Sequence, residues 1–217
     1  MIRLGHRGIA LGMPGQGKSQ MCAHLFAVHE GQRLLIDVQD HYELGPDAGE
    51  DAIDVDRVSA IDWRARTIRY TPRRFSAREF NELYGAIYHR GDVLVWLDEA
   101  LGPTSAHSTP MMVRRVITQG RKRRITHLAT SQRPAGIERG LVSLSEHVWV
   151  FRMVDPDDIQ TVSTRLGLSP RELGEELRQL PHQGFLYHEA GSGPIRQFGP
   201  LPAGLVARAQ RIVHIPA

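Results

Sequence analysis

A glycine-rich segment at residues 12–19 constrains the fold of this chain more than any other part of the sequence. It matches the phosphate-binding pattern G-x-x-x-x-G-K-[ST] in full, and it reads Gly12-Met13-Pro14-Gly15-Gln16-Gly17-Lys18-Ser19. Lysine is rare, since only Lys18 and Lys122 occur among 217 residues, so a chance match has a probability on the order of 10⁻³. The pattern therefore predicts a strand, a phosphate-binding turn and a helix, in that order.

Each fixed position of this P-loop has a physical role. The glycines let the backbone curl so that several N–H groups point at phosphate, and the following helix adds its positive N-terminal end. We expect Lys18 to reach the β- and γ-phosphates of ATP and the Ser19 hydroxyl to bind Mg²⁺. The expected nucleotide-binding residues are Gly12, Gly15, Gln16, Gly17, Lys18, Ser19 and Gln20.

Strand and helix patterns alternate along the chain. Apolar spacing and cap signals predict helices over 19–30, 77–88 and 110–119, with others beginning near 156 and 170. Gly31 is the expected cap of the first helix. Short apolar runs predict strands at 34–38, 67–70, 93–97, 125–130 and 147–153, and a C-terminal β-hairpin from 184–188 and 195–198. Residues 39–60 read as acidic and irregular. We expect one α/β domain over 1–217 with a mostly parallel sheet.

Two acids follow an uninterrupted apolar strand. Residues 93–97 read Val-Leu-Val-Trp-Leu, which favours a strand covered on both faces, and Asp98 and Glu99 come directly after it. Ligands of such sheets bind beyond the carboxyl ends of the strands, where the P-loop also opens. We expect Asp98 to orient Mg²⁺ and Glu99 to accept a proton from the attacking water.

A polar residue follows the strand at 125–130. In a P-loop fold, a side chain at the end of the strand beside the P-loop strand contacts the γ-phosphate and reports its loss. Gln132, which stands in Ser131-Gln132-Arg133-Pro134, is the candidate. The alternative is a solvated glutamine in a turn.

These segments together resemble the FtsK/HerA superfamily of DNA-pumping ATPases. The resemblance covers about residues 8–160 and is most specific at residues 120–134, GRKRRITHLATSQRP, although Ser131 is an insertion relative to the family's ATQRP-like ending. It implies a RecA-like core with an additional strand between the P-loop strand and the Asp98–Glu99 strand. It also implies a ring, usually a hexamer, with DNA at its centre, and an arginine finger acting on the neighbouring subunit's ATP. The resemblance assigns the finger to Arg121 in the first place, with Arg123 and Arg124 as the alternatives.

The subfamily is narrowed by what the sequence lacks. Seven residues precede the Gly8 strand, no membrane segment occurs, and no winged-helix domain follows the core, so the chain most resembles the genome-packaging ATPases of membrane-containing icosahedral viruses. The resemblance implies double-stranded DNA as partner, with a capsid or membrane portal protein. No secretion signal is visible and Cys22 is the single cysteine, so we expect the host cytoplasm or a virion vertex as location.

Arginine supplies almost all of the positive charge. The formal net charge is +3 and the sequence pI is about 9.3. One basic group comprises Arg114, Arg115, Arg121, Lys122, Arg123 and Arg124, and a second comprises Arg64, Arg66, Arg69, Arg73, Arg74 and Arg78. Such groups bind DNA phosphates without reading sequence. The alternative for the second group is pairing with the acidic residues of 39–60 or plain solvation. The eleven histidines show no metal-binding spacing.

Other functions stay open on the sequence alone. A DNA motor of conjugation, plasmid maintenance or phage extrusion belongs to the same class. A small-molecule or nucleotide kinase also carries a P-loop, but it needs neither a water-activating Glu99 nor a basic turn before Gln132. A non-hydrolysing scaffold switched by ATP would not need Glu99.

Overall fold

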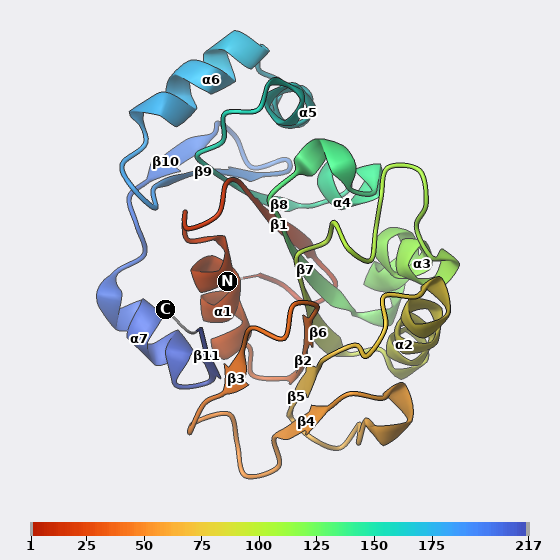
Figure 1. The fold of residues 1–217 in the computed structure, drawn as a ribbon. Helices are drawn as coiled ribbons and strands as arrows, with labels where there is room; N and C mark the ends of the chain where they lie inside the picture. Colours follow the sequence, from red (N-terminus) through yellow and green to blue (C-terminus); the bar gives the residue numbers. More distant parts are fainter. Residues whose placement is uncertain (1, 216–217) are drawn as a thin grey trace.

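The computed structural model describes residues 2–215, which form a nine-stranded sheet with helices on both faces (Figure 1). The strand order is β10-β9-β8-β1-β7-β6-β2-β5-β4. The parallel part contains β8 (His147–Phe151), β1 (Arg7–Leu11), β7 (Thr126–Ser131), β6 (Val93–Asp98), β2 (Gln32–Asp37), β5 (Thr67–Tyr70) and β4 (Ile53–Val55). Strands β9 (Phe185–Glu189) and β10 (Arg196–Phe198) run antiparallel at one edge, as the predicted hairpin.

The sheet separates the helices into two layers, and a hydrophobic core lies between the sheet and each layer. One core lies between the sheet and α1 (Lys18–Ala27), and α7 (Ala203–Gln210) packs beside that helix. The other core joins the opposite sheet face to α2 (Ala77–Arg90), α3 (Met111–Gln119), α4 (Arg139–Ser143), α5 (Pro156–Leu166) and α6 (Pro170–Gln179). Figure 1 shows α1 and α7 on one side of the sheet and α2, α3 and α4 on the other.

Strand β6 is buried on both faces, as its unbroken apolar sequence predicts. Trp96 belongs to the core under α1, whereas Val95 and Leu97 belong to the core under α2 and α3. Strand β7 lies between β1 and β6 and pairs in parallel with both. The predicted additional strand is therefore confirmed, and the P-loop and the Asp98 strand are separated by one strand.

Several elements differ from the sequence prediction. The first helix ends at Ala27 with Val28 as its cap, so Gly31 is not the cap. Residues 39–60 are not wholly irregular, because they contain β3 (Glu43–Leu44), β4 and the short helix η1 (Val58–Ala60). The sequence also gave no sign of α4, of α7 or of β11 (Val213–His214), which pairs with β3. The strands β3, β4 and β11 depend on tertiary packing, because two or three residues carry too little local periodicity to specify a strand.

Three of the six arginines in the second basic group, Arg64, Arg69 and Arg73, form ion pairs. Arg69 is 7% exposed, and its guanidinium bonds the fully buried Asp37 at 2.8 Å and also reaches Asp40 and Asp54. Arg64 pairs at the surface with Asp62, which lies outside residues 39–60. The predicted pairing with acidic residues of 39–60 is therefore confirmed for Arg69, through Asp40 and Asp54.

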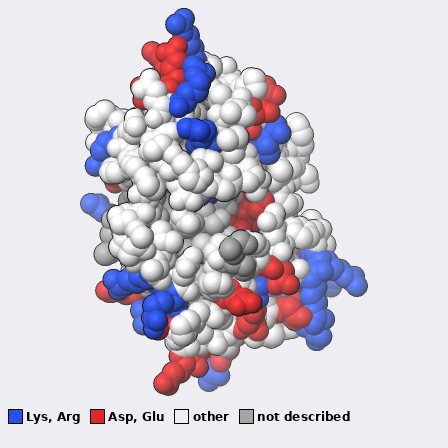
Figure 2. Space-filling view, turned by 60° about the vertical axis from the view of Figure 1, so that its left-hand side comes forward, with Lys and Arg blue, Asp and Glu red and all other residues white. Residues whose placement is uncertain are grey.

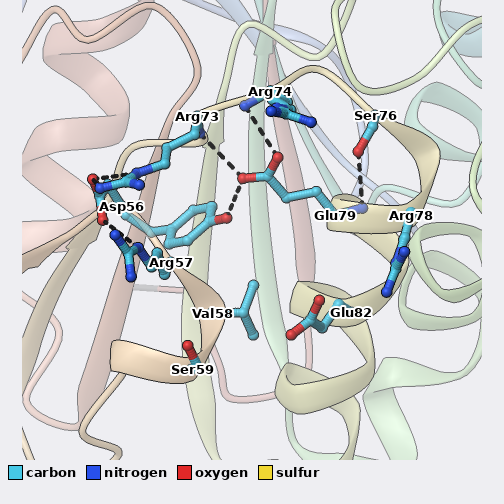
Figure 3. A pocket seen from close by; sticks show the side chains of 11 residues that line it. Asp56, Arg57, Val58, Ser59, Arg73, Arg74, Ser76, Arg78, Glu79 and Glu82 are labelled. Carbon is cyan, nitrogen blue, oxygen red and sulfur yellow. Dashed lines mark hydrogen bonds and ion pairs between the residues drawn. The ribbon is translucent and has the colours of Figure 1, made fainter.

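Arg73 belongs to a cavity of about 480 Å³ beyond the end of β5 (Figure 3). Its side chain pairs with Asp56. The Glu79 carboxylate accepts hydrogen bonds from the backbone N–H groups of Arg73 and Arg74, at 3.2 and 3.1 Å, which closes one wall of the cavity. Four arginines and three acids line this cavity, so its charge is nearly balanced. It also lies several strands away from the P-loop strand.

Asp37 fixes the loop that follows β2. Its carboxylate accepts the backbone N–H groups of His41 and Tyr42 at 2.9–3.0 Å, in addition to the Arg69 guanidinium. Tyr42 is thereby held at 2% exposure against the Trp96 ring, with 5.1 Å between the ring centroids. Arg69 therefore positions residue 42 through a shared buried carboxylate.

We expect Arg69→Leu to lower the free energy of unfolding by about 3 kcal/mol, because it leaves the buried Asp37 carboxylate without its cation. Urea unfolding monitored by circular dichroism measures the change. Arg64→Leu is the matched control: its side chain is 92% exposed, and we expect nearly unchanged stability. Equal stability of the two variants would contradict the role given to Arg69.

Candidate active site

The P-loop connects the end of β1 to the start of α1. Gly12, Gly15 and Gly17 have φ angles of 147°, 72° and 95°, a range that side chains other than glycine rarely adopt. A Cβ at Gly12 would also lie 2.7 Å from the Cβ of Phe151. The loop is anchored by the N–H of Met13, which donates to the carbonyl of Arg152 at 2.9 Å. The glycines are thus required by conformation and, at Gly12, by space.

Lys18 lies inside this turn. Its side chain is buried at 6% exposure, and its Nζ donates to the carbonyl of Met13 at 2.8 Å. Burial lowers the pKa of Lys18, and the nearby carboxylates of Glu99 and Asp98 partly oppose this effect. Helix α1 has no acidic residue in its first turn and no side-chain cap at Gly17. Its first N–H groups and the lysine therefore give this turn a positive potential, which suits phosphate.

Asp98 ends β6 in a buried position. Burial is the main cause that raises its pKa to about 6, while hydrogen bonds from the Thr130 and Tyr42 hydroxyls favour the ionised form. The Thr130 hydroxyl donates to Asp98 Oδ1 at 2.8 Å. The Tyr42 hydroxyl lies near enough to Ser19 and Asp98 for both to affect the pKa of Tyr42, so the two predicted metal-binding side chains lie close to one phenol.

These oxygen donors fit magnesium. Ser19 and Asp98 offer a hydroxyl and a carboxylate, and within residues 2–215 no group of three or more His, Cys, Asp or Glu side chains could hold a metal by itself. Magnesium commonly takes one or two protein oxygens and completes its shell with phosphate and water. The residues present therefore fit an ion that arrives with a nucleotide.

Glu99 is held in an unusual conformation directly beyond β6. Its φ of 54° is left-handed, which costs a non-glycine residue on the order of 1 kcal/mol. Its carboxylate accepts the Ser131 hydroxyl and the backbone N–H of Gln132, both at 3.3 Å. The predicted proton acceptor and the predicted γ-phosphate sensor therefore lie in contact.

Ser131 is the last residue of β7, so Gln132 is the first residue after the strand. The Ser131 carbonyl accepts the N–H of Gly12 at 3.2 Å, and Ser131 pairs with Leu11 of β1. Gln132 therefore directly follows a residue that is hydrogen-bonded to the first glycine of the P-loop.

The arginine-finger candidates lie at the other end of β7, just before the strand begins. Arg121 and Arg123 belong to η2 (Gly120–Arg123), which precedes β7, and a six-residue strand spans roughly 20 Å. Arg124 pairs with Asp92 at 2.7 Å, and the Arg123 guanidinium donates to the carbonyls of Tyr88 and His89. The Arg121 side chain is 65% exposed and approaches Glu146 only to 3.8 Å. None of the three serves the P-loop of its own chain, and Arg121 is the least engaged.

Sequence reasoning missed three residues of this site. Tyr42 and Thr130 provide the hydroxyls that contact Asp98, and Gln183 lies against Gly17, where an added Cβ would be 3.5 Å from the Gln183 Cβ. Gln183 has a left-handed φ of 60° in the loop before β9. No local motif marks Tyr42 or Gln183. For Thr130, its place two residues before the predicted sensor Gln132 was the one available signal.

Comparisons in sequence and in structure relate this chain to known proteins. No family model matches the chain. A 103-residue region is 34% identical to the DNA packaging ATPase P9 of Enterobacteria phage PRD1 and spans 48% of this chain and 42% of that relative. The genome packaging NTPase B204 of Sulfolobus turreted icosahedral virus 2, solved with ATP-gammaS, superposes with a TM-score of 0.75 at 16% identity, over 91% of this chain and 98% of that one.

The chain has the fold of a viral packaging ATPase. The resemblance predicted from the motifs is confirmed, and so is the fold class, a mostly parallel P-loop sheet with a C-terminal hairpin. A second solved structure, VirB4 of Thermoanaerobacter pseudethanolicus, shares the fold with a TM-score of 0.68 at 11% identity, over 93% of this chain and 91% of that one. Among residues 2–215, every helix is too short or too polar to span a membrane.

We expect Asp98→Asn to raise the free energy of unfolding at pH 7.5 without nucleotide or metal by on the order of 2 kcal/mol. The folded chain keeps the Asp98 proton up to about pH 6, whereas the unfolded chain releases it near the ordinary value of 3.8. This carboxyl therefore costs stability as pH rises through that interval.

Urea unfolding of both proteins at pH 4 and pH 7.5 measures the effect. The gain of the asparagine variant should be large at pH 7.5 and nearly absent at pH 4. A gain of the same size at both values would show that ionisation of Asp98 is not its cause.

Proposed function

We propose that this chain is an ATPase that drives double-stranded DNA into a preformed viral capsid. The observation that carries the proposal is the convergence of Lys18, Asp98, Glu99 and Gln132 at the carboxyl ends of the three adjacent strands β1, β7 and β6. The similarity in sequence to a DNA packaging ATPase of a phage supports the nature of the cargo. A kinase site needs no carboxylate placed for water, so Glu99 favours hydrolysis.

In this proposal the P-loop binds the triphosphate of ATP. The backbone N–H groups at the start of α1 and the Lys18 ammonium neutralise the β- and γ-phosphates. Ser19 and Asp98 would hold magnesium, which would supply further positive charge to the bound nucleotide. Glu99 orients a water molecule and accepts its proton while the water oxygen attacks the γ-phosphorus and ADP leaves. Gln132, whose backbone already contacts the Glu99 carboxylate at 3.3 Å, senses the γ-phosphate.

The basic residues divide between DNA and the neighbouring subunit. Figure 2 shows one face of the molecule with basic and acidic side chains interspersed around its rim and a centre with little charge, so this face has no continuous basic track. The first basic group, residues 114–124, is concentrated on α3 and η2. We propose that it faces DNA phosphates and an adjacent subunit of a hexameric ring. A capsid or membrane portal protein at the virion vertex, reached from the host cytoplasm, is the corresponding docking partner.

ATPase assays with and without double-stranded DNA test the proposal. If the chain is a motor, DNA should stimulate hydrolysis; a kinase would transfer phosphate to an acceptor, and a scaffold would only bind ATP.

We expect Glu99→Gln to bind ATP normally and to hydrolyse it at least about 100-fold more slowly, because the base is lost. Glu175→Gln, which changes an exposed acid of α6, is the matched control. Near-normal turnover by Glu99→Gln would remove Glu99 from this role.

We expect inactive Arg121→Ala subunits to regain part of their ATPase activity when they are mixed with Lys18→Ala subunits. In a mixed ring, the intact P-loop of the first variant meets the intact Arg121 of the second. Titration of one variant into the other at constant total protein measures the rescue. Mixtures of Arg121→Ala with the double variant Lys18→Ala/Arg121→Ala are the control and should stay inactive. No rescue at any ratio would contradict a finger that acts between subunits.

A further inference from the structure

Thr130 contacts both acids of the site through one hydroxyl group. Its Oγ1 donates to Asp98 Oδ1 at 2.8 Å and accepts the backbone N–H of Glu99 at 2.8 Å. Its carbonyl oxygen accepts the N–H of Ala100, also at 2.8 Å. The last residue of β6 and the two residues after it are thus all bound by a single residue of the neighbouring strand.

The position of this hydroxyl leaves it little freedom. Thr130 is 2% exposed and stands on β7, whose neighbours β1 and β6 pair with it on both sides. Threonine has a stiff χ1 angle because two heavy atoms branch at its Cβ. A hydroxyl carries one proton, so its donation to Asp98 leaves the oxygen lone pairs free to accept from Glu99. The two hydrogen bonds are therefore compatible and occur together.

The bond to the Glu99 N–H occurs where the backbone is strained. Glu99 has a φ of 54°, and this left-handed turn ends β6 and sends the Glu99 carboxylate toward Ser131 and Gln132. An unfavourable backbone conformation persists only when its surroundings fix it. The Thr130 hydroxyl and carbonyl supply two of the bonds that fix it, on the Glu99 and Ala100 N–H groups.

We propose that Thr130 is a positioning residue for hydrolysis, one that orients the Asp98 carboxylate and holds Glu99 in its left-handed conformation. Thr130 touches neither nucleotide nor water in this assignment and acts through the two acids. The inference rests on the proposed ATPase function, but it makes no use of DNA. It predicts that one hydroxyl group controls both the response to magnesium and the rate of the chemical step.

The strand offers a matched control at its other end. Thr126 also belongs to β7, is 1% exposed, and accepts a backbone N–H through its hydroxyl, from Gly5 at 3.0 Å. It lies at the amino end of the strand, away from the P-loop. Thr126→Val and Thr130→Val therefore remove the same group from the same strand with similar burial, and they differ in distance from the site.

The test compares the basal ATPase activity of the parent chain, Thr130→Val, Thr130→Ser and Thr126→Val over a range of ATP and Mg²⁺ concentrations. We expect Thr130→Val to lower kcat by about 10- to 100-fold and to raise the half-saturating Mg²⁺ concentration, as loss of a residue behind a ligand does, while KM for ATP changes little. Thr130→Ser keeps the hydroxyl and should retain at least about a third of the parent kcat. Thr126→Val should stay near the parent value.

Three results would overturn the inference. The first is a Thr130→Val kcat within about twofold of the parent, which lies below the usual effect of such a residue. The second is an equal loss in Thr126→Val, which would indicate a general packing defect. The third is a loss in Thr130→Ser as large as in Thr130→Val, which would make shape and not the hydroxyl the cause.

The inference and the proposed function fail in different ways. Basal hydrolysis that follows the expected order in all four proteins, without stimulation by double-stranded DNA, would count against the translocation function and leave the role of Thr130 intact. A parent chain without any basal hydrolysis would overturn both.

Discussion

Strand β7 is the element on which the site depends, because its backbone hydrogen bonds hold β1 on one side and β6 on the other. The P-loop follows β1 and the two acids follow β6, so their separation is fixed by two strand spacings of about 4.8 Å each. The end of β7 then fills the gap, with the Ser131 carbonyl on the N–H of Gly12 and the Thr130 hydroxyl on Asp98. The parallel sheet thereby brings distant parts of the sequence together at the carboxyl ends of its central strands.

Burial of charged groups shifts the pKa values of two residues at the carboxyl ends of these strands. Lys18 and Asp98 are each 6% exposed, and burial lowers the pKa of the lysine and raises that of the acid to about 6. Both shifts express the cost of keeping ions out of water. Under the proposed function, the phosphates of ATP would compensate the charge of the lysine and magnesium would compensate that of the acid.

Arginines that look equivalent in the sequence have different roles in the structure. Arg69 is buried and joins the loop after β2 to β5 through Asp37, whereas Arg121 is exposed and only loosely engaged. Composition does not separate these cases, because both lie in basic segments. The separation follows from which carboxylates the fold places within reach, and this decides which cations remain for phosphate.

The sequence by itself determined the P-loop, the strand that ends at Asp98, the additional strand predicted at residues 125–130 and the C-terminal hairpin, because each has a local pattern of glycines, apolar runs or turn residues. It also predicted Lys18 and Ser19 as site residues from the P-loop pattern, and Glu99 and Gln132 from their places after strands. Only the tertiary structure decided the contacts of Tyr42, Thr130 and Gln183, the ends of short elements such as β3, and the pairing of Arg69. Those depend on side chains that meet across 30 or more residues of chain, for example Thr130 and Asp98, and no local pattern encodes such a meeting.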